Sequence, residues 1–134
     1  NISFKIGSKK YTSKVTVKAY TNPISSLTVT GVKNGSSSNL AGKFKNKNYS
    51  SLKLSKNVKN ATVTCKAASG WKIVRIGTFD ENNKLQRSIS TRNEGASVLS
   101  LHAGNLTKNH INEITVDLVN TKTGGSLSCT MYLS

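Results

Sequence analysis

Acidic residues are scarce in this chain. Five Asp and Glu residues stand against twenty Lys and Arg residues, which gives a formal net charge of +15 over 134 residues. Calcium takes about six to eight oxygen ligands, many of them carboxylates, so the composition argues against a calcium site. Polyanions of any kind, in contrast, are attracted to so basic a chain.

Long apolar runs are absent as well. No run approaches the ~20 residues that a membrane-spanning helix requires, so we expect no membrane insertion in this segment. Neither an initiator Met nor a signal-peptide pattern opens the sequence, which starts directly on the strand-like ISFKI. We therefore expect a piece of a longer protein.

Arginine is rare among the cations. Arg75, Arg87 and Arg92 are the only arginines, and every other cation is Lys. Reading of base edges and bidentate contact with phosphate both favour the guanidinium group. The composition therefore predicts no specific nucleic-acid recognition.

Cysteine is limited to Cys65 and Cys129. Two cysteines without a CxxC motif do not make a zinc site, and the sequence predicts neither a metal nor a cofactor. Both residues share the parity of neighbouring apolar residues, so the strands that carry them can face each other across a core. They form either a disulfide, worth roughly 4 kcal/mol in the chain-entropy model, or two reduced, buried thiols. Both alternatives stay open.

Catalytic signatures are missing too, since the sequence has no GxSxG, HExxH, GxGxxG or P-loop motif. His102 and His110 could be combined with Asp117 or Glu113 and a serine into a triad, but nothing in the spacing fixes that geometry. Surface histidines in loops are the simpler interpretation. We expect a protein that is not an enzyme.

Alternation of apolar and polar residues is what the sequence does have, most clearly from 61 to 79. Apolar side chains occupy every second position from Ala61 to Ala67, which is typical of a strand with one buried face. Ala68-Ser69-Gly70 is a tight turn, and Trp71 opens the next run. The pattern predicts a hairpin that a second sheet must cover, with Trp71 sealed between the two layers.

Shorter runs of the same kind fill most of the remaining chain. We expect strands within Ile2–Ile6, Tyr11–Tyr20, Leu27–Val32, Leu85–Ile89, Ala96–Leu101, Glu113–Val119 and Leu127–Leu133. The weak pattern between 39 and 59 predicts two short strands near a sheet edge, and His102–Asn112 allows a helical turn. Short strands separated by polar, glycine-rich turns predict an all-β fold, an antiparallel two-sheet sandwich.

Asn22-Pro23 is the candidate domain boundary or a crossover between two sheets, because proline lacks the N–H that a strand ladder needs. We expect one sandwich domain over residues 23–134. Residues 1–22 are either the last strands of a preceding unit or extra strands on the same sandwich.

Several motifs of the chain occur together in one known family. Gly70–Ile73 precedes a polar turn, and Ile114–Leu118 leads into Asn120–Gly124 before a last strand that ends Met131-Tyr132-Leu133. With these motifs the sandwich domain resembles the bacterial Ig-like (cadherin-like) β-sandwich repeats of Gram-positive surface proteins. Tyr20–Ile24 resembles the junction between two such repeats. The resemblance implies an immunoglobulin-like fold and an extracellular or cell-surface multidomain protein, and it supplies no catalytic residues.

One segment interleaves lysines with aromatic residues and is the candidate ligand site. The candidate polyanion-binding residues are Lys43, Phe44, Lys45, Lys47, Tyr49 and Lys53. On an extended strand, Lys43, Lys45 and Lys47 would form a ladder with a spacing of about 7 Å on one face. An edge strand kept soluble by its lysines explains the same pattern.

The expected function combines the resemblance with the absence of catalytic signatures. It is a non-catalytic module of a bacterial cell-surface or secreted protein, serving as a structural spacer or adhesion unit. Its expected partners are neighbouring Ig-like repeats, or polyanionic glycans of a host or a cell wall. The alternative is a polyanion- or glycan-binding module that uses the lysine-rich segment.

Overall fold

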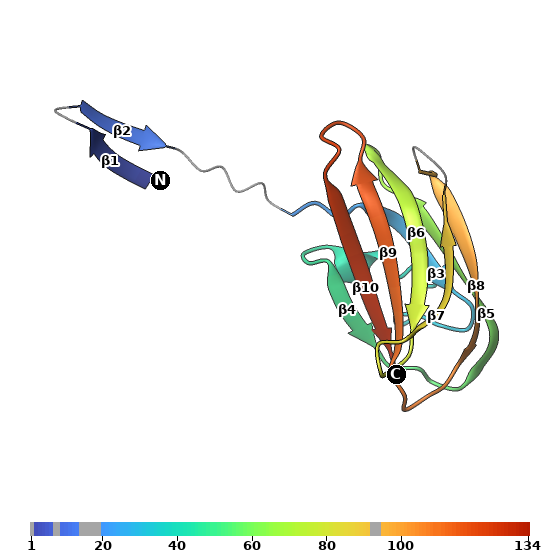
Figure 1. Cartoon of the computed structure of the whole chain (residues 1–134). Coiled ribbons are helices and arrows are strands. Elements are labelled where there is room, and N and C mark those ends of the chain that lie inside the picture. The colour runs from blue at the N-terminus through green and yellow to red at the C-terminus, as the bar shows by residue number, and fades with distance from the viewer. Residues whose placement is uncertain (1, 7–8, 14–19, 92–94) are drawn as a thin grey trace.

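The computed structural model describes residues 2–6, 9–13, 20–91 and 95–134. Strands dominate this part of the chain, so the all-β prediction is confirmed (Figure 1). The elements are β1 (Ile2–Ile6), β2 (Lys9–Ser13), β3 (Ile24–Val29), the 3-10 helix η1 (Ala41–Phe44), β4 (Tyr49–Leu52), β5 (Val58–Ala67), β6 (Trp71–Phe79), β7 (Leu85–Ser90), β8 (Val98–Leu106), β9 (Asn112–Asn120) and β10 (Ser126–Leu133).

β1 and β2 form a small antiparallel sheet of their own, in which Ile2 lies opposite Ser13. Of the strand expected within Tyr11–Tyr20, the structure contains the part up to Ser13, and residues 14–19 lie outside the described residues. The proposed boundary between residues 22 and 23 stays a prediction.

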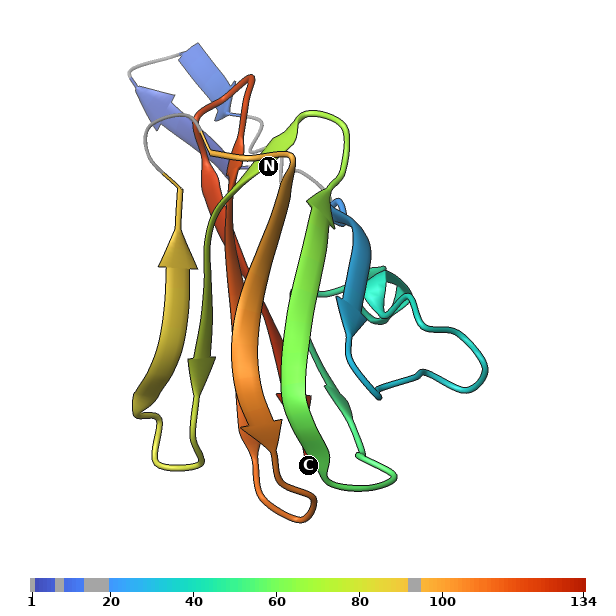
Figure 2. The same cartoon turned by 90° about the vertical axis from the view of Figure 1, so that its right-hand side faces the viewer.

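Two further sheets face each other, as Figure 2 shows from the side. One has the order β3-β5-β8 and the other β4-β10-β9-β6-β7. The predicted antiparallel pairing is found throughout these two sheets except at one edge, where β4 pairs in parallel with β10 and Leu52 lies opposite Leu133. The chain folds back beside β3 after leaving it, and Leu40 N–H donates to Leu27 O (2.7 Å). It then continues as β4.

The hairpin predicted for residues 61–79 is also wrong, because β5 and β6 belong to different sheets. The turn occurs at the predicted residues: Trp71 N–H donates to Ala68 O (3.0 Å), and Gly70 has a φ of +85°. Each strand buries one apolar face. Crossing from one sheet to the other brings both faces to a single core, and other strands provide the hydrogen-bonded neighbours.

The core lies between these two sheets, and both contribute to it. Its fully buried side chains include Leu27, Val63 and Cys65 from the three-stranded sheet and Ile73, Ile76, Leu118 and Met131 from the five-stranded sheet. Trp71 is half-buried and packs against the core from outside. The indole is therefore not sealed between the layers, because Trp71 is the first residue of β6 and lies at the rim of the sandwich.

The segment from 39 to 59 contains one edge strand, β4, instead of the predicted two. The first part of this segment forms η1. Ala41 and Phe44 in η1 and Leu40 directly before it are all buried. Apolar residues at positions i, i+1 and i+4 suit a helical turn and do not fit the period of two that a strand requires.

The helical turn predicted at His102–Asn112 does not form, and the strand pattern continues instead. β8 extends to Leu106, a short turn follows, and β9 begins at Asn112. The Asn112 amide closes this turn, since its Nδ2 donates to the carbonyl oxygens of Thr107 and His110, both at 3.0 Å.

The chain enters and leaves the sandwich at opposite ends. At the upper end in Figure 1, beside the turns that precede β6 and β10, Ala68 N–H donates to Pro23 O (2.8 Å). At the lower end, beside the β6–β7 and β8–β9 turns, Leu54 N–H donates to Ser134 O (2.6 Å). The full length of the strands separates the two points.

Candidate functional site

The lysine-rich segment does not form the predicted ladder. Lys43 and Phe44 lie in η1, Lys45 and Lys47 lie in the bend that follows, and Tyr49 begins β4. Phe44 is 1% exposed and belongs to the core, so its ring cannot contact a surface ligand. The regular spacing expected for Lys43, Lys45 and Lys47 on one face of a strand therefore does not occur.

Tyr49, in contrast, is a surface residue with 55% exposure. Nζ of Lys47 lies 4.8 Å from the centroid of its ring. Such a cation–π contact is worth about 0.5–1 kcal/mol at an exposed site. Lys45 and Lys53 are exposed too, so the surface part of the predicted site consists of Lys45, Lys47, Tyr49 and Lys53. Polyanion binding by these residues stays a prediction.

The two cysteines lie in opposite sheets, Cys65 in β5 and Cys129 in β10, and both are fully buried free thiols. Burial raises the pKa of Cys65 to about 12, and the nearby Cys129 adds to this shift. Burial likewise raises the pKa of Cys129 to about 11, against the opposing effect of the Tyr20 hydroxyl. Thiols of this kind are inert at neutral pH. Oxidation of these two thiols to a disulfide across the core stays a prediction.

Tyr20 joins the incoming chain to the sandwich. Its hydroxyl donates to Phe44 O (2.8 Å), and burial is the main cause that raises its pKa. Asn22 makes a second link, because its Nδ2 donates to Ala41 O (2.9 Å) while its Oδ1 accepts from Ile24 N–H (3.0 Å). These bonds hold the segment before β3 against η1.

The titratable residues considered for a triad do not share a site. His102 in β8 and Asp117 in β9 lie between buried neighbours on their own strands, so they point outward from opposite sheets. His110 Nδ1 lies 3.3 Å from Glu81 Oε1, and Asp117 Oδ1 accepts from Ser128 Oγ–H (2.6 Å). Within the described residues, no three His, Cys, Asp or Glu side chains are grouped to hold a metal ion.

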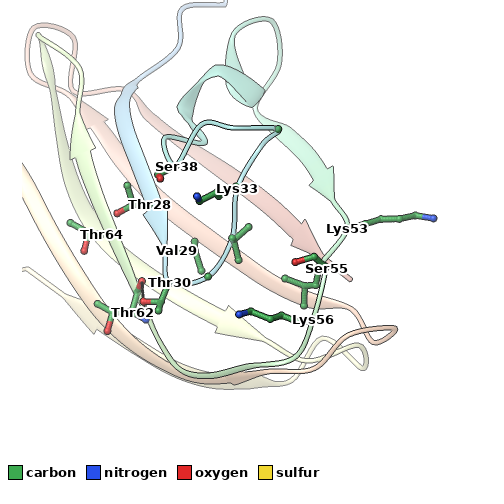
Figure 3. A pocket seen from close by; sticks show the side chains of 14 residues that line it. Thr28, Val29, Thr30, Lys33, Ser38, Lys53, Ser55, Lys56, Thr62 and Thr64 are labelled. Carbon is green, nitrogen blue, oxygen red and sulfur yellow. Dashed lines mark hydrogen bonds between the residues drawn. The ribbon is translucent and has the colours of Figure 1, made fainter.

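An open cavity of about 690 Å³ lies beside the outer face of the three-stranded sheet (Figure 3). Its floor is a group of threonines, which come from β3, from β5 and from the loop that follows β3. Its other walls come from that loop and from residues 53–56 after β4. We name it the threonine–lysine cavity, after Thr28, Thr30, Thr62, Thr64, Lys33 and Lys56 in its lining.

Of the predicted ligand residues, only Lys53 lines this cavity. Sequence reasoning missed the other residues that line the cavity. Three separate segments build the lining, and only the strand order brings these segments together. One signal is present in the sequence: threonines two residues apart at 28 and 30 and again at 62 and 64. The register places Thr28 opposite Thr64, and Thr30 N–H donates to Thr62 O (3.2 Å).

A second cavity, of about 440 Å³, lies where β6 and β7 of one sheet approach β8 of the other. Arg87 lines it together with Asp80 and Glu113. The guanidinium group lies across Gly104, where an added Cβ would meet Arg87 Nε at 3.3 Å. Charges of both signs meet in this cavity, so it has no clear preference for an anion or a cation.

Comparisons with protein-family models, curated proteins and solved structures give no match for the chain. In the part of the chain that the structure describes, no helix is both long and apolar enough to cross a membrane.

Proposed function

We propose that this chain is a non-catalytic, immunoglobulin-like module of a bacterial cell-surface or secreted multidomain protein, and that it acts as a structural spacer or adhesion unit. The module comprises residues 23–134, and its neighbours along the chain are similar β-sandwich repeats.

The strand order supports an immunoglobulin-like topology. β3, β5 and β8 correspond to strands A, B and E, and β6, β9 and β10 correspond to C, F and G, with β7 as an added C′ strand. Two features depart from antibody domains. The cysteines lie on the B and G strands in place of B and F, and Trp71 is only half-buried.

The spacer function is supported by the positions at which the sandwich begins and its last strand finishes. Pro23 lies at the upper end and Ser134 at the lower end, separated by roughly 30 Å, the length of a nine-residue strand such as β9. Modules joined through these points extend along one line, and each adds its full length.

Tension along that line loads the terminal strands lengthwise. β3 begins at the upper end and β10 finishes at the lower end, so each is pulled along its own axis past its neighbours. Ladder hydrogen bonds run across the strands, so many must break together. β10 is held on both sides, by β9 and by the parallel β4.

Single-molecule force spectroscopy tests this proposal. The chain is attached through Thr21→Cys and Ser134→Cys, which reproduces the pull of neighbouring modules. The control attachment, Ser69→Cys with Thr123→Cys, uses two turns at the upper end and peels the strands apart one hydrogen bond at a time. We expect a several-fold higher unfolding force for the first pair. An equal or lower force would reject the load-bearing spacer.

A second candidate function, a polyanion- or glycan-binding module, is favoured by the exposure of Lys45, Lys47 and Lys53. We expect retention on heparin that collapses from low to moderate salt, because exposed charges are screened. Retention that is unchanged in the triple variant Lys43→Ser, Lys45→Ser, Lys47→Ser would reject Lys43, Lys45 and Lys47 as the binding residues.

A further inference from the structure

The threonine–lysine cavity is a concave basic surface without acidic residues. Lys33, Lys53 and Lys56 belong to its lining, and none of the lining residues is Asp or Glu. In Figure 3, Lys56 reaches toward Thr30 and Thr62, whereas Lys53 points away into solvent. The side chains of Lys33 and Lys56 thus border the cavity, whereas the residue Lys53 lines it but extends its side chain away from it.

Within the described residues, no ion pair compensates this positive charge. Asp80 is the first acidic residue of the chain, so β3, β4 and β5 and the segments between them contain no carboxylate. The described acidic residues, Asp80, Glu81, Glu113 and Asp117, belong to β9 and the β6–β7 turn. Among the described residues, the one contact with the geometry of a salt bridge joins His110 to Glu81, far along the chain from the cavity.

The floor of the cavity presents hydroxyl groups in a regular array. Thr28 and Thr30 lie one pleat apart along one edge, about 7 Å, and Thr64 and Thr62 face them at about 5 Å. Thr30 Oγ1 accepts from Thr62 N–H (3.0 Å) and donates to Thr62 O (3.4 Å), and the Thr64 hydroxyl is hydrogen-bonded to Ser100 Oγ (3.0 Å). Each of these two hydroxyls keeps a further lone pair, because a hydroxyl has one donor and two acceptor sites. Such an array suits a ligand that is itself rich in hydroxyl groups.

The wall of the cavity is built in advance. The loop after β3 turns at Gly31 (φ +73°), where an added Cβ would lie 3.2 Å from Val58 Cγ2. It is then closed by two backbone hydrogen bonds between Asn34 and Ser37, at 2.9 and 3.1 Å. A ligand therefore has little loop to order on binding, which lowers the entropic cost.

We propose that the threonine–lysine cavity binds an acidic glycan, a hydroxyl-rich chain that carries sulfate or phosphate esters. Lys33 and Lys56 contact the ester anion, and the threonines hydrogen-bond the hydroxyl groups beside it. The lining has no aromatic residue on which a base could stack, which disfavours single-stranded nucleic acid. This inference rests on the second candidate function and moves its site from Lys43–Lys47 to this cavity.

Titration of the ¹⁵N-labelled chain followed by NMR locates the site. The probes are a heparin tetrasaccharide for sulfate esters, a glycerol phosphate oligomer for phosphate esters, and neutral maltotetraose. We expect one or both acidic probes to shift the amides of Thr30, Gly31 and Thr62, and the stronger of the two identifies the natural ester. Equal binding of maltotetraose, or no binding of either acidic probe, would overturn the proposal. Shifts confined to residues 45–49 would overturn it too, while leaving polyanion binding intact.

Two matched double variants separate a site from bulk charge. Lys33→Ser with Lys56→Ser removes the cavity cations, and Lys84→Ser with Lys122→Ser removes the same charge from turns of the other sheet. We expect about a tenfold loss of affinity for the first pair and less than about twofold for the second at physiological salt. Equal losses would overturn the proposal.

A third variant tests the hydroxyl array without changing charge. Thr62→Val keeps the branched shape, and we expect a loss of about threefold in affinity because one hydroxyl partner disappears. NMR spectra of the free variants check that each is folded. If the affinity is unchanged both in Thr62→Val and in the Lys33→Ser, Lys56→Ser double variant, the assignment of the cavity as the glycan site is overturned.

Discussion

The three-stranded and five-stranded sheets turn similar apolar faces toward each other but carry different charges on the outside. Inward, leucines such as Leu27 in β3 and Leu118 in β9 are both fully buried. Outward, β3 and β5 present uncharged polar side chains and lysines but no carboxylate, whereas Glu113 and Asp117 point outward from β9.

This difference separates what holds the sandwich together from what it displays. Burial of apolar area dominates folding stability and is shared by the two sheets. Exposed charges contribute little to stability, typically about 0–1 kcal/mol for each ion pair. The lysines beside β3 and β5 can therefore bind a ligand while contributing almost nothing to folding stability.

The strongest test of a shared core truncates one buried leucine in each sheet. We expect Leu27→Ala and Leu118→Ala each to lower the free energy of unfolding by about 2–5 kcal/mol, because each leaves a cavity among packed side chains. Urea denaturation measures both losses.

Leu85→Ala is the matched control, because Leu85 lies on β7 with 45% exposure. We expect its loss to stay below about 1 kcal/mol. If Leu27→Ala costs no more than Leu85→Ala, the three-stranded sheet does not share the core, and the comparison between the sheets breaks.

The buried thiols, one in each sheet, give the next largest effect. The folded pKa values of Cys65 and Cys129, about 12 and about 11, exceed the ordinary value of 9.0. Above pH 9.0 the unfolded chain loses protons that the folded chain keeps, so stability is lost as the pH rises toward those folded values. The limit for one thiol is about 1.4 kcal/mol per pH unit.

The Cys65→Ala, Cys129→Ala double variant separates the effect of the thiols on stability from that of the lysines and tyrosines. Lysines and tyrosines titrate in the variant and in the unmodified protein alike. We expect the free energy of unfolding of the variant to fall less steeply between pH 9 and 11, as measured by urea denaturation under reducing conditions. Parallel pH profiles would mean that the thiols are not buried in the folded protein.

Much of this architecture is predictable from local sequence pattern. β9 and β10 follow strict alternation, and the Asn120 side chain closes the turn between them by accepting from Lys122 N–H (2.9 Å) and Thr123 N–H (3.1 Å). The Asp80 turn is similar, with Asp80 Oδ1 accepting from Asn82 N–H (2.9 Å). Short-range hydrogen bonds of this kind depend only on residues that are close in sequence, so they can be predicted from it.

Pairing between strands is not predictable in the same way. The turn at Ala68–Gly70 looks as tight as a hairpin turn, yet it leads from one sheet to the other, and only contacts far apart in sequence decide this. The threonine–lysine cavity depends on the same contacts, because Lys33, Lys56 and Thr62 meet only after the sheet has formed. An expectation based on one lysine-rich segment therefore finds Lys53 and misses the rest.

The smallest expected effects come from the outer charges, one taken from each side of the molecule. Glu81 lies 3.3 Å from His110, with side chains 49% and 58% exposed, and water and salt screen such a pair. We expect Glu81→Gln and Lys56→Ser each to change the free energy of unfolding by less than about 0.5 kcal/mol, measured by urea denaturation at low and high salt. A loss above about 1 kcal/mol for Lys56→Ser would show that this lysine supports the fold. The charge beside β3 and β5 would then have a structural explanation, and the contrast between the two outer faces would no longer indicate a ligand.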